Sequence, residues 1–294
     1  MTGWRELDPD ELNRQYRLAR LVPDLDTVLD GYARDSAAAR ARFPVRTDLR
    51  YGPEGPQTLD LFPVSRPGAP LLVFVHGGFW QESGKEAAAF PASGLLAGGV
   101  AFAALGYGLA PRYRLEEMVA TTARAVRWLA AHAADLGVDP ARIHLAGSSA
   151  GAHLAAMAML EQDLPIGGVI LLSGVYDLEP VTRTWVNDAL GLTVPRARAA
   201  SPLLLPLPDR LPPVVLARGE GETAEFARQQ AELADRLRAV TALTELVVPG
   251  RHHFDLPYDL GDPDSPLGTA VLRQLAGSAQ PASTRLPGSS HRSG

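Results

Sequence analysis

The sequence predicts an α/β fold in which helices cover both faces of a mostly parallel β-sheet. From about residue 71 to residue 248, short apolar runs alternate with longer stretches of helical periodicity. The apolar runs are continuous, which is typical of strands that are buried on both faces. The chain of 294 residues is 46% hydrophobic, enough for one large core. We therefore predict a single domain over residues 1–277.

The amino-terminal part is predicted to contain two helices and a hairpin. Residues 8–40 carry apolar residues at helical spacing, and Pro23 divides them into two short helices. The segment TDLRYGPEGPQTLDLFPV, residues 47–64, alternates around a Gly/Pro turn as a β-hairpin does. These elements precede the alternating region.

The alternating region supplies the parallel strands and most of the helices. Strands are predicted at residues 71–75, 100–105, 142–146, 167–172, 213–217 and 243–248. Helices are predicted at residues 85–97, 115–134, 150–160 and 223–239. With the hairpin, this gives a sheet of about eight strands.

Two segments depart from the alternation. Residues 175–212 are rich in proline, and we interpret them, together with the helices in 8–40, as a small cap over the carboxyl edge of the sheet. Residues 278–294 contain almost nothing to bury and are predicted to form a disordered tail.

Composition restricts the partners of the protein. The formal net charge is −5 with a pI near 5.8. The protein therefore has no overall positive charge that would attract the phosphates of a nucleic acid or an anionic membrane. Cysteine is absent, and no compact His/Asp cluster predicts a metal site. No signal peptide or membrane span of ~20 apolar residues is evident. We expect a cytoplasmic protein with a small-molecule substrate and no cofactor, and a homodimer is left open.

The segment IHLAGSSAGAHLAA contains a candidate nucleophile. Gly147, Ser149 and Gly151 fit the pattern GxSxG and lie between a predicted strand and a predicted helix. This pattern places a serine on a sharp turn, where the residues two positions before and after must be small, so the register selects Ser149 rather than Ser148. The alternative is that GSSAG is only a helix N-cap or an anion-binding turn.

The segment HGGFW, residues 76–80, follows the first apolar run, where esterases carry an HGGG-type loop. Glycines allow backbone N–H groups to approach a ligand oxygen closely. We expect an oxyanion hole made by the N–H groups of Gly78, Phe79 and Ala150. His76 is interpreted as a structural residue that fixes the loop.

Aromatic residues near the expected mouth are candidates for substrate binding. Phe79 and Trp80 belong to the same loop, and Trp185 belongs to the proline-rich segment. Each could be a core residue, but we expect Phe79, Trp80 and Trp185 to line a pocket for an aromatic substrate.

The candidate base follows the last predicted strand. In hydrolases with a GxSxG turn, the chain order is serine, then aspartate or glutamate, then histidine. VVPGRHHFD offers His252 and His253 at the final position. We select His253 because it precedes the apolar Phe254, which should hold it at the boundary of the core; His252 is the alternative.

The candidate acid follows the preceding strand. GEGETAEF offers Glu220 and Glu222, and Glu222 lies three residues beyond Gly219, where a tight turn can direct its carboxylate back to an imidazole. We select Glu222, although it could instead be an acidic residue that stabilises the amino end of the next helix. Glu220 and Asp177 are the other candidates.

Together these motifs resemble the α/β-hydrolase superfamily and, within it, the arylformamidase (kynurenine formamidase) and related esterase group. The resemblance extends from about Leu12 to Leu275 and rests on HGGFW, GSSAGAHLAA, SGVYDLEP, VNDALGL, GETAEFARQ and HHFD. Family members carry the acid at the position of Glu222 and the histidine at the position of His253. The chain departs from many relatives in having glutamate instead of aspartate, and GSSAG instead of GHSAG.

The resemblance implies the α/β-hydrolase fold and a serine hydrolase of tryptophan catabolism. The main expectation is hydrolysis of N-formyl-L-kynurenine to L-kynurenine and formate, with Ser149 as nucleophile, His253 as general base and Glu222 orienting the imidazole. A carboxylesterase for small acyl esters would use the same machinery. A hydrolase-fold protein that binds a ligand without turnover is the third hypothesis.

Overall fold

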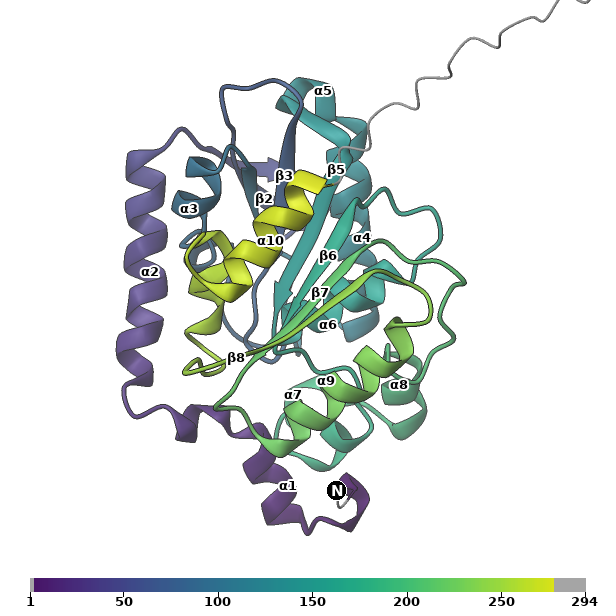
Figure 1. Cartoon of the computed structure of the whole chain (residues 1–294). Coiled ribbons are helices and arrows are strands. Elements are labelled where there is room, and N and C mark those ends of the chain that lie inside the picture. The colour runs from purple at the N-terminus through teal and green to yellow at the C-terminus, as the bar shows by residue number, and fades with distance from the viewer. Residues whose placement is uncertain (1–2, 278–294) are drawn as a thin grey trace, which may run out of the picture.

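One eight-stranded sheet forms the centre of the computed structural model, which describes residues 3–277 (Figure 1). The strand order is β1-β2-β4-β3-β5-β6-β7-β8; β1 and β2 are antiparallel and the other strands are parallel. The strands are β1 (Arg46–Arg50), β2 (Thr58–Phe62), β3 (Ala69–Val75), β4 (Ala101–Leu105), β5 (Val138–Ser148), β6 (Gly168–Leu172), β7 (Val214–Gly219) and β8 (Leu243–Val248). The predicted α/β class is confirmed, and the tail predicted at 278–294 lies outside the described residues.

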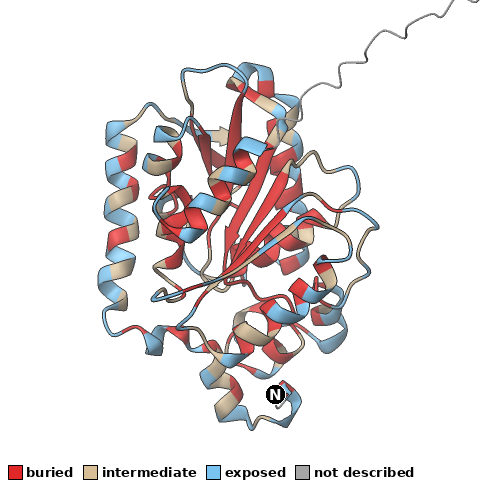
Figure 2. Ribbon diagram, in the orientation of Figure 1, coloured by how far each residue is buried: buried red, intermediate tan, exposed pale blue. Residues whose placement is uncertain are grey.

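Helices cover both faces of this sheet. One face packs against α2 (Leu25–Arg42), α3 (Ala92–Ala97) and α10 (Pro266–Gly277). The opposite face packs against α4 (Leu115–Ala131), α6 (Ala150–Met159) and α9 (Ala224–Leu237). Figure 2 shows that the central strands are buried. Successive side chains of each strand point to opposite faces of the sheet and pack into the two separate clusters of the core.

Shorter helices lie in the connections. They are α1 (Pro9–Tyr16), α5 (Ala133–Leu136), α7 (Asn187–Leu190) and α8 (Val194–Ala199). The 3-10 turns are η1 (Trp4–Glu6), η2 (Leu18–Leu21), η3 (Lys85–Ala87), η4 (Pro180–Arg183) and η5 (Leu256–Gly261). Within residues 3–277, no helix combines the length and the apolar character that crossing a membrane requires.

Three predicted elements differ in the structure. The helix predicted at 85–97 is divided into η3 and α3 because Pro91, which lacks an N–H group, stands at the N-cap of α3. The helix after Pro23 is not short, since α2 has 18 residues. Strand β8 is an edge strand and is only partly buried, so its apolar run is not covered on both faces.

The amino-terminal segment packs beside residues 175–212 and the start of α9. Asn13 in α1 accepts a hydrogen bond from the backbone N–H of Trp185 at 3.0 Å, and the carbonyl of Gln15 accepts one from the Thr223 hydroxyl at 2.9 Å. These contacts bring α1 to the carboxyl edge of the sheet, where the loops after β6 and β7 emerge.

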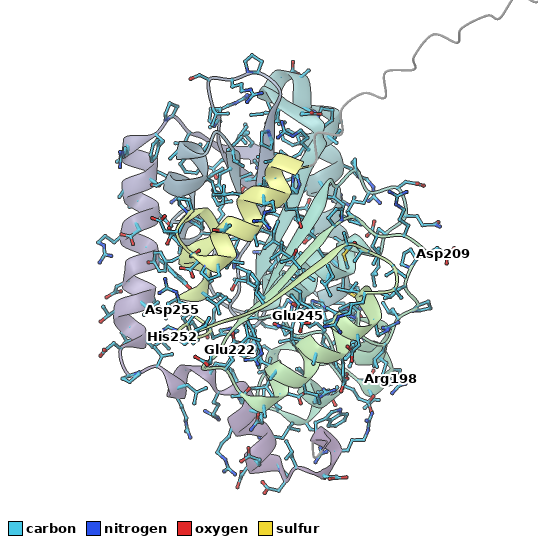
Figure 3. All side chains as sticks on the ribbon, in the orientation of Figure 1. Arg198, Asp209, Glu222, Glu245, His252 and Asp255 are labelled. Atoms are coloured by element: carbon cyan, nitrogen blue, oxygen red, sulfur yellow. The ribbon has the colours of Figure 1, made fainter. Side chains whose placement is uncertain are left out.

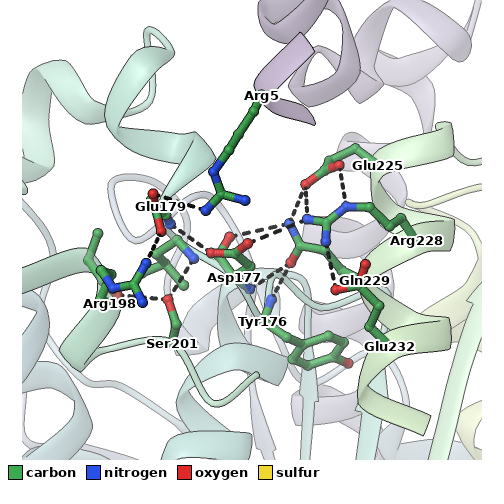
Figure 4. A network of polar contacts seen from close by, with 12 residues as sticks. Arg5, Tyr176, Asp177, Glu179, Arg198, Ser201, Glu225, Arg228, Gln229 and Glu232 are labelled. Atoms are coloured by element: carbon green, nitrogen blue, oxygen red, sulfur yellow. Dashed lines mark hydrogen bonds and ion pairs between the residues drawn. The ribbon is translucent and has the colours of Figure 1, made fainter. Parts of the chain in front are cut away.

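A buried polar network reinforces this arrangement (Figure 4). The Gln229 side chain of α9 accepts hydrogen bonds from the N–H groups of Tyr176 and Asp177 at 2.6 and 2.8 Å. Arg228 of α9 pairs with Glu225 at 2.7 Å and with Asp177 at 3.5 Å. The loop after β6 is therefore held to α9 by both backbone and side-chain groups.

Candidate active site

Ser149 lies on a sharp turn between β5 and α6. It is the N-cap of α6, and its backbone adopts φ +56° and ψ −118°, a left-handed conformation that non-glycine residues rarely adopt. The backbone N–H of Ser149 donates to the carbonyl of Leu172 in β6 at 2.8 Å. A strained backbone of this kind persists only where the surrounding structure enforces it. Here the hydrogen bond to β6 holds the turn in place.

Close packing around this turn requires glycine at both flanking positions. A Cβ atom at Gly147 would lie 2.2 Å from the carbonyl oxygen of Gly151, and one at Gly151 would lie 2.0 Å from the carbonyl oxygen of Val75. Both distances are far below van der Waals contact. The register of the motif therefore places Ser149 at the strained position, while Ser148 is the last residue of β5.

The loop HGGFW packs directly against the turn. A Cβ atom at Gly77 would lie 3.1 Å from the Cβ of Ser149, and Gly78 and Phe79 adopt φ angles of +105° and +47°. The backbone N–H groups of Gly78, Phe79 and Ala150 donate to no protein acceptor within residues 3–277. Three unpaired donors beside a serine can receive the negative charge of a tetrahedral intermediate.

His76 at the start of this loop has a structural environment. Its Nδ1 lies 2.8 Å from the carbonyl oxygen of Gly77, and its ring stacks on Tyr107 with centroids 4.5 Å apart. Burial lowers the pKa of His76 to about 4, which keeps the imidazole neutral at pH 7. These contacts support the interpretation of His76 as the residue that fixes the loop.

Glu222 and His253 form a hydrogen-bonded pair at the carboxyl ends of β7 and β8. The Oε2 atom of Glu222 lies 3.1 Å from Nδ1 of His253. The other carboxylate oxygen, Oε1, accepts hydrogen bonds from the hydroxyl of Ser173 at 2.5 Å and from the N–H of Gly219 at 2.7 Å. The Glu222 side chain is completely buried, so the carboxylate is fixed by these contacts. Figure 3 shows Glu222 near the loop that follows β8.

His252, the alternative base, is engaged elsewhere. Its Nδ1 accepts hydrogen bonds from the N–H groups of Phe254 and Asp255 at 3.1 and 3.2 Å, within its own turn. Its side chain does not line the cavity that contains Ser149. The structure therefore brings His253, and not His252, together with the serine.

The alternative acids are also engaged elsewhere. One carboxylate oxygen of Glu220 accepts a hydrogen bond from the N–H of Gly250 at 3.2 Å. Asp177 belongs to the network with Arg228, and its carboxylate accepts from the N–H of Glu179 at 3.0 Å. Of the three candidate carboxylates, Glu222 is the one that contacts His253.

Ser149 and His253 line the same cavity of about 550 Å³. Phe79 and Trp185 line it as well, with their rings edge to face at 5.4 Å. The amino-terminal segment closes another side of the cavity through η2 and α2. The volume is in the usual range for a small-molecule site.

The expectation that Trp80 lines this cavity is wrong. Its side chain is fully buried in the core, and its indole N–H donates to Nδ1 of His153 in α6 at 3.3 Å. Both Phe79 and Trp80 adopt positive φ angles. The ring of Phe79 lies at the cavity, whereas the ring of Trp80 lies in the core. The sequence does not show which of two adjacent aromatic residues turns inward.

The burial of His153 predicts a pH dependence of stability. Burial lowers the pKa of His153 from 6.5 to about 4, so the folded state binds a proton less readily than the unfolded chain. Stability should therefore be lost as pH falls from about 6.5 to about 4, by roughly 3 kcal/mol from this residue. Urea unfolding at several pH values should show a steeper acid loss for the wild type than for His153→Gln; equal slopes would contradict the prediction.

Ser173 was not identified from the sequence. It follows β6, is 2% exposed, adopts a positive φ of +52°, and donates to Glu222. One feature of the sequence could have identified Ser173. It follows a predicted strand, and the next predicted strand along the chain precedes the candidate acid. A single serine outside any motif is too common for this position to have indicated a role.

Replacement of Ser173 by alanine should reduce kcat by about tenfold with little change in KM, because the lost hydrogen bond to a charged group loosens Glu222 and thereby the imidazole. The Gly219 N–H still holds the carboxylate, which limits the loss. Steady-state kinetics over a range of pH would measure the effect. An unchanged kcat would show that Ser173 does not help to position Glu222.

Comparisons with known proteins identify relatives of this chain. A family model described as BD-FAE matches residues 59–167. The kynurenine formamidase of Danio rerio is 30% identical, with 94% of this chain and 99% of that protein covered. An esterase of Mycobacterium tuberculosis, LipQ, is 31% identical over 73% of this chain and 59% of its own length. A crystal structure from Silicibacter sp. TM1040 has a TM-score of 0.78 at 28% identity, covering 89% of this chain and 98% of that chain.

Proposed function

Since the chain belongs to the kynurenine formamidase family and has the α/β-hydrolase fold, we propose that it hydrolyses N-formyl-L-kynurenine to L-kynurenine and formate. The observation that carries the proposal is the match over 99% of the length of a kynurenine formamidase. The hydrogen-bonded pair of Glu222 and His253 beside Ser149 supports it, since a hydrolase of this class needs these three groups together. The reaction is a step of tryptophan catabolism.

In the proposed acylation step, the Ser149 hydroxyl attacks the formyl carbon while His253 takes its proton. Glu222 holds the imidazole through Nδ1 and stabilises its charged form, so Nε2 is the atom that exchanges the proton. The N–H groups of Gly78, Phe79 and Ala150 receive the oxyanion. When the C–N bond breaks, His253 gives the proton to the departing arylamine, which leaves a formyl ester on Ser149.

The deacylation step repeats the chemistry with water. His253 takes a proton from the water as it attacks the formyl ester, and then returns the proton to the oxygen of Ser149, which releases formate. An aniline-type nitrogen leaves more readily than an alkylamine, so a site of the esterase type suffices. A formyl group also needs almost no acyl pocket, which fits the close approach of the Gly77 backbone to Ser149.

A carboxylesterase for small acyl esters is the second candidate, because the esterase of Mycobacterium tuberculosis matches most of this chain. The ratio of kcat/KM for N-formyl-L-kynurenine to kcat/KM for p-nitrophenyl acetate separates the two. We expect a ratio above one. If the esters are hydrolysed and the formamide is not, the protein is an esterase; if neither is hydrolysed, the family fold serves binding without turnover.

A further inference from the structure

The catalytic cavity opens toward arginine side chains from the amino-terminal segment. Arg17, the N-cap of η2, and Arg20 within η2 line the cavity of Ser149 and His253. Both arginines also line a second cavity of about 580 Å³, together with Arg183. The two cavities therefore adjoin each other, and Arg17 and Arg20 belong to the lining of both.

These arginines are not neutralised by neighbouring carboxylates. Within residues 3–277, Arg17, Arg20 and Arg183 form no ion pair and donate no side-chain hydrogen bond, whereas Arg14 one turn earlier pairs with Glu11 at 2.7 Å. The protein has a net charge of −5, so unpaired cationic groups at a cavity have the sign opposite to that of the protein as a whole. An unpaired guanidinium is suited to a carboxylate, which it can bind through two parallel hydrogen bonds.

The acidic side chains that line the two cavities leave the positive charge in excess. Glu82 is the one carboxylate in the described lining of the catalytic cavity, against Arg17 and Arg20. In the second cavity, Asp10 and Asp188 accompany a larger number of arginines. An anionic group in the catalytic cavity would therefore meet a favourable potential near η2.

A continuous series of contacts leads from the nucleophile to Arg17. The HGGFW loop approaches Ser149, and Phe79 of that loop packs edge to face on Trp185 at 5.4 Å. The guanidinium of Arg17 lies over the Trp185 ring, 5.6 Å from its centroid. A substrate with its acyl group at Ser149 and an aromatic ring along Phe79 and Trp185 would extend toward Arg17.

We propose that Arg17 and Arg20 bind a carboxylate on the leaving-group side of the substrate, so that the enzyme selects aryl substrates that carry this carboxylate over those that lack it. The inference rests on the proposed function, because N-formyl-L-kynurenine carries such a carboxylate at the end of the side chain next to its formamide. The carboxylate lies away from the reacting carbon, so the arginines contribute to substrate binding rather than to the bond-breaking step.

The test compares a substrate that carries the carboxylate with one that lacks it in the double variant Arg17→Gln/Arg20→Gln. KM for N-formyl-L-kynurenine should rise by about tenfold or more, as expected for the loss of charge-assisted hydrogen bonds. KM for 3-amino-1-(2-formamidophenyl)propan-1-one, which keeps the aryl formamide and the amino group and lacks only the carboxylate, should stay within about twofold. Because salt screens the attraction between the carboxylate and the arginines, added salt should raise KM for N-formyl-L-kynurenine in the wild type and have less effect in the variant.

Arg66→Gln/Arg210→Gln is the matched control. Arg66 and Arg210 are exposed and precede the amino ends of β3 and β7, at the sheet edge opposite the site, so their loss removes the same two charges without touching either cavity. It should leave KM for both substrates unchanged. If the double variant affects both substrates equally, or neither, Arg17 and Arg20 do not select the carboxylate.

A second pair of substrates separates this inference from the proposed function. If the wild type does not hydrolyse the formamide but hydrolyses esters, the same variant is compared on 3-acetoxybenzoate and its neutral methyl ester. A selective rise in KM for 3-acetoxybenzoate supports the arginine site although the formamidase proposal has failed. Calorimetric binding of L-kynurenine needs no turnover, and equal Kd values for wild type and double variant would overturn the inference.

Discussion

Ser149→Ala should abolish hydrolysis of formamide and ester substrates, with a loss in kcat on the order of a million-fold. The hydroxyl is the proposed nucleophile, and no other side chain can replace it on the strained turn at φ +56°. The fold should be unaffected, because alanine retains the backbone contact from residue 149 to the carbonyl of Leu172. Turnover measured beside thermal unfolding separates a chemical loss from a structural one.

Ser148→Ala is the control for the register of the turn. Ser148 also lines the cavity, but it is the last residue of β5 and does not occupy the left-handed position. Its replacement should change kcat by no more than a few-fold. Comparable losses in Ser148→Ala and Ser149→Ala would contradict the assignment of Ser149 as the nucleophile.

Glu222→Gln should lower kcat by about 10,000-fold with little change in KM, similar to the loss in serine proteases when the triad aspartate becomes asparagine. Oε1 of Glu222 accepts from Ser173 and Gly219, so the amide oxygen of glutamine would remain there. The amide NH₂ group would then face Nδ1 of His253 and donate to it. This selects the tautomer with a proton on Nε2, which cannot accept the proton of the serine.

Glu220→Gln is the matched control for this change. Glu220 lies two residues away, carries the same charge and contacts Gly250 rather than His253. Its replacement should leave kcat within a few-fold. A silent Glu222→Gln, combined with a large loss in Glu220→Gln or Asp177→Asn, would move the acid to that other position.

Much of the fold could be predicted because parallel strands and amphipathic helices leave periodic apolar patterns. The helix α10 was not predicted, although Leu267, Val271 and Leu275 have helical spacing and are buried. Its first turn contains Pro266 and Gly268, which weaken the local signal. The helix forms because its apolar side packs on the sheet, which is a tertiary effect.

The candidate site was predictable where a motif restricts the backbone. A Cβ atom added to either glycine beside Ser149 would lie less than 2.5 Å from a backbone atom, so both positions require glycine. The GxSxG pattern therefore predicts the geometry of the turn. The environment of Trp80, the hydrogen bond from Ser173 and the approach of Arg17 to Trp185 arise from packing between distant segments. No local pattern in the sequence encodes such contacts.

The most direct test of the proposed catalytic role of Ser149 is covalent labelling with a fluorophosphonate, followed by mass spectrometry of the intact protein and its peptides. We expect one adduct per chain, located on Ser149, and slower labelling in the presence of excess N-formyl-L-kynurenine. Glu222→Gln should label much more slowly than the wild type, because His253 then cannot activate the serine. The absence of an adduct on the folded wild-type protein, or an adduct on Ser148, would contradict the assignment of Ser149 as the nucleophile.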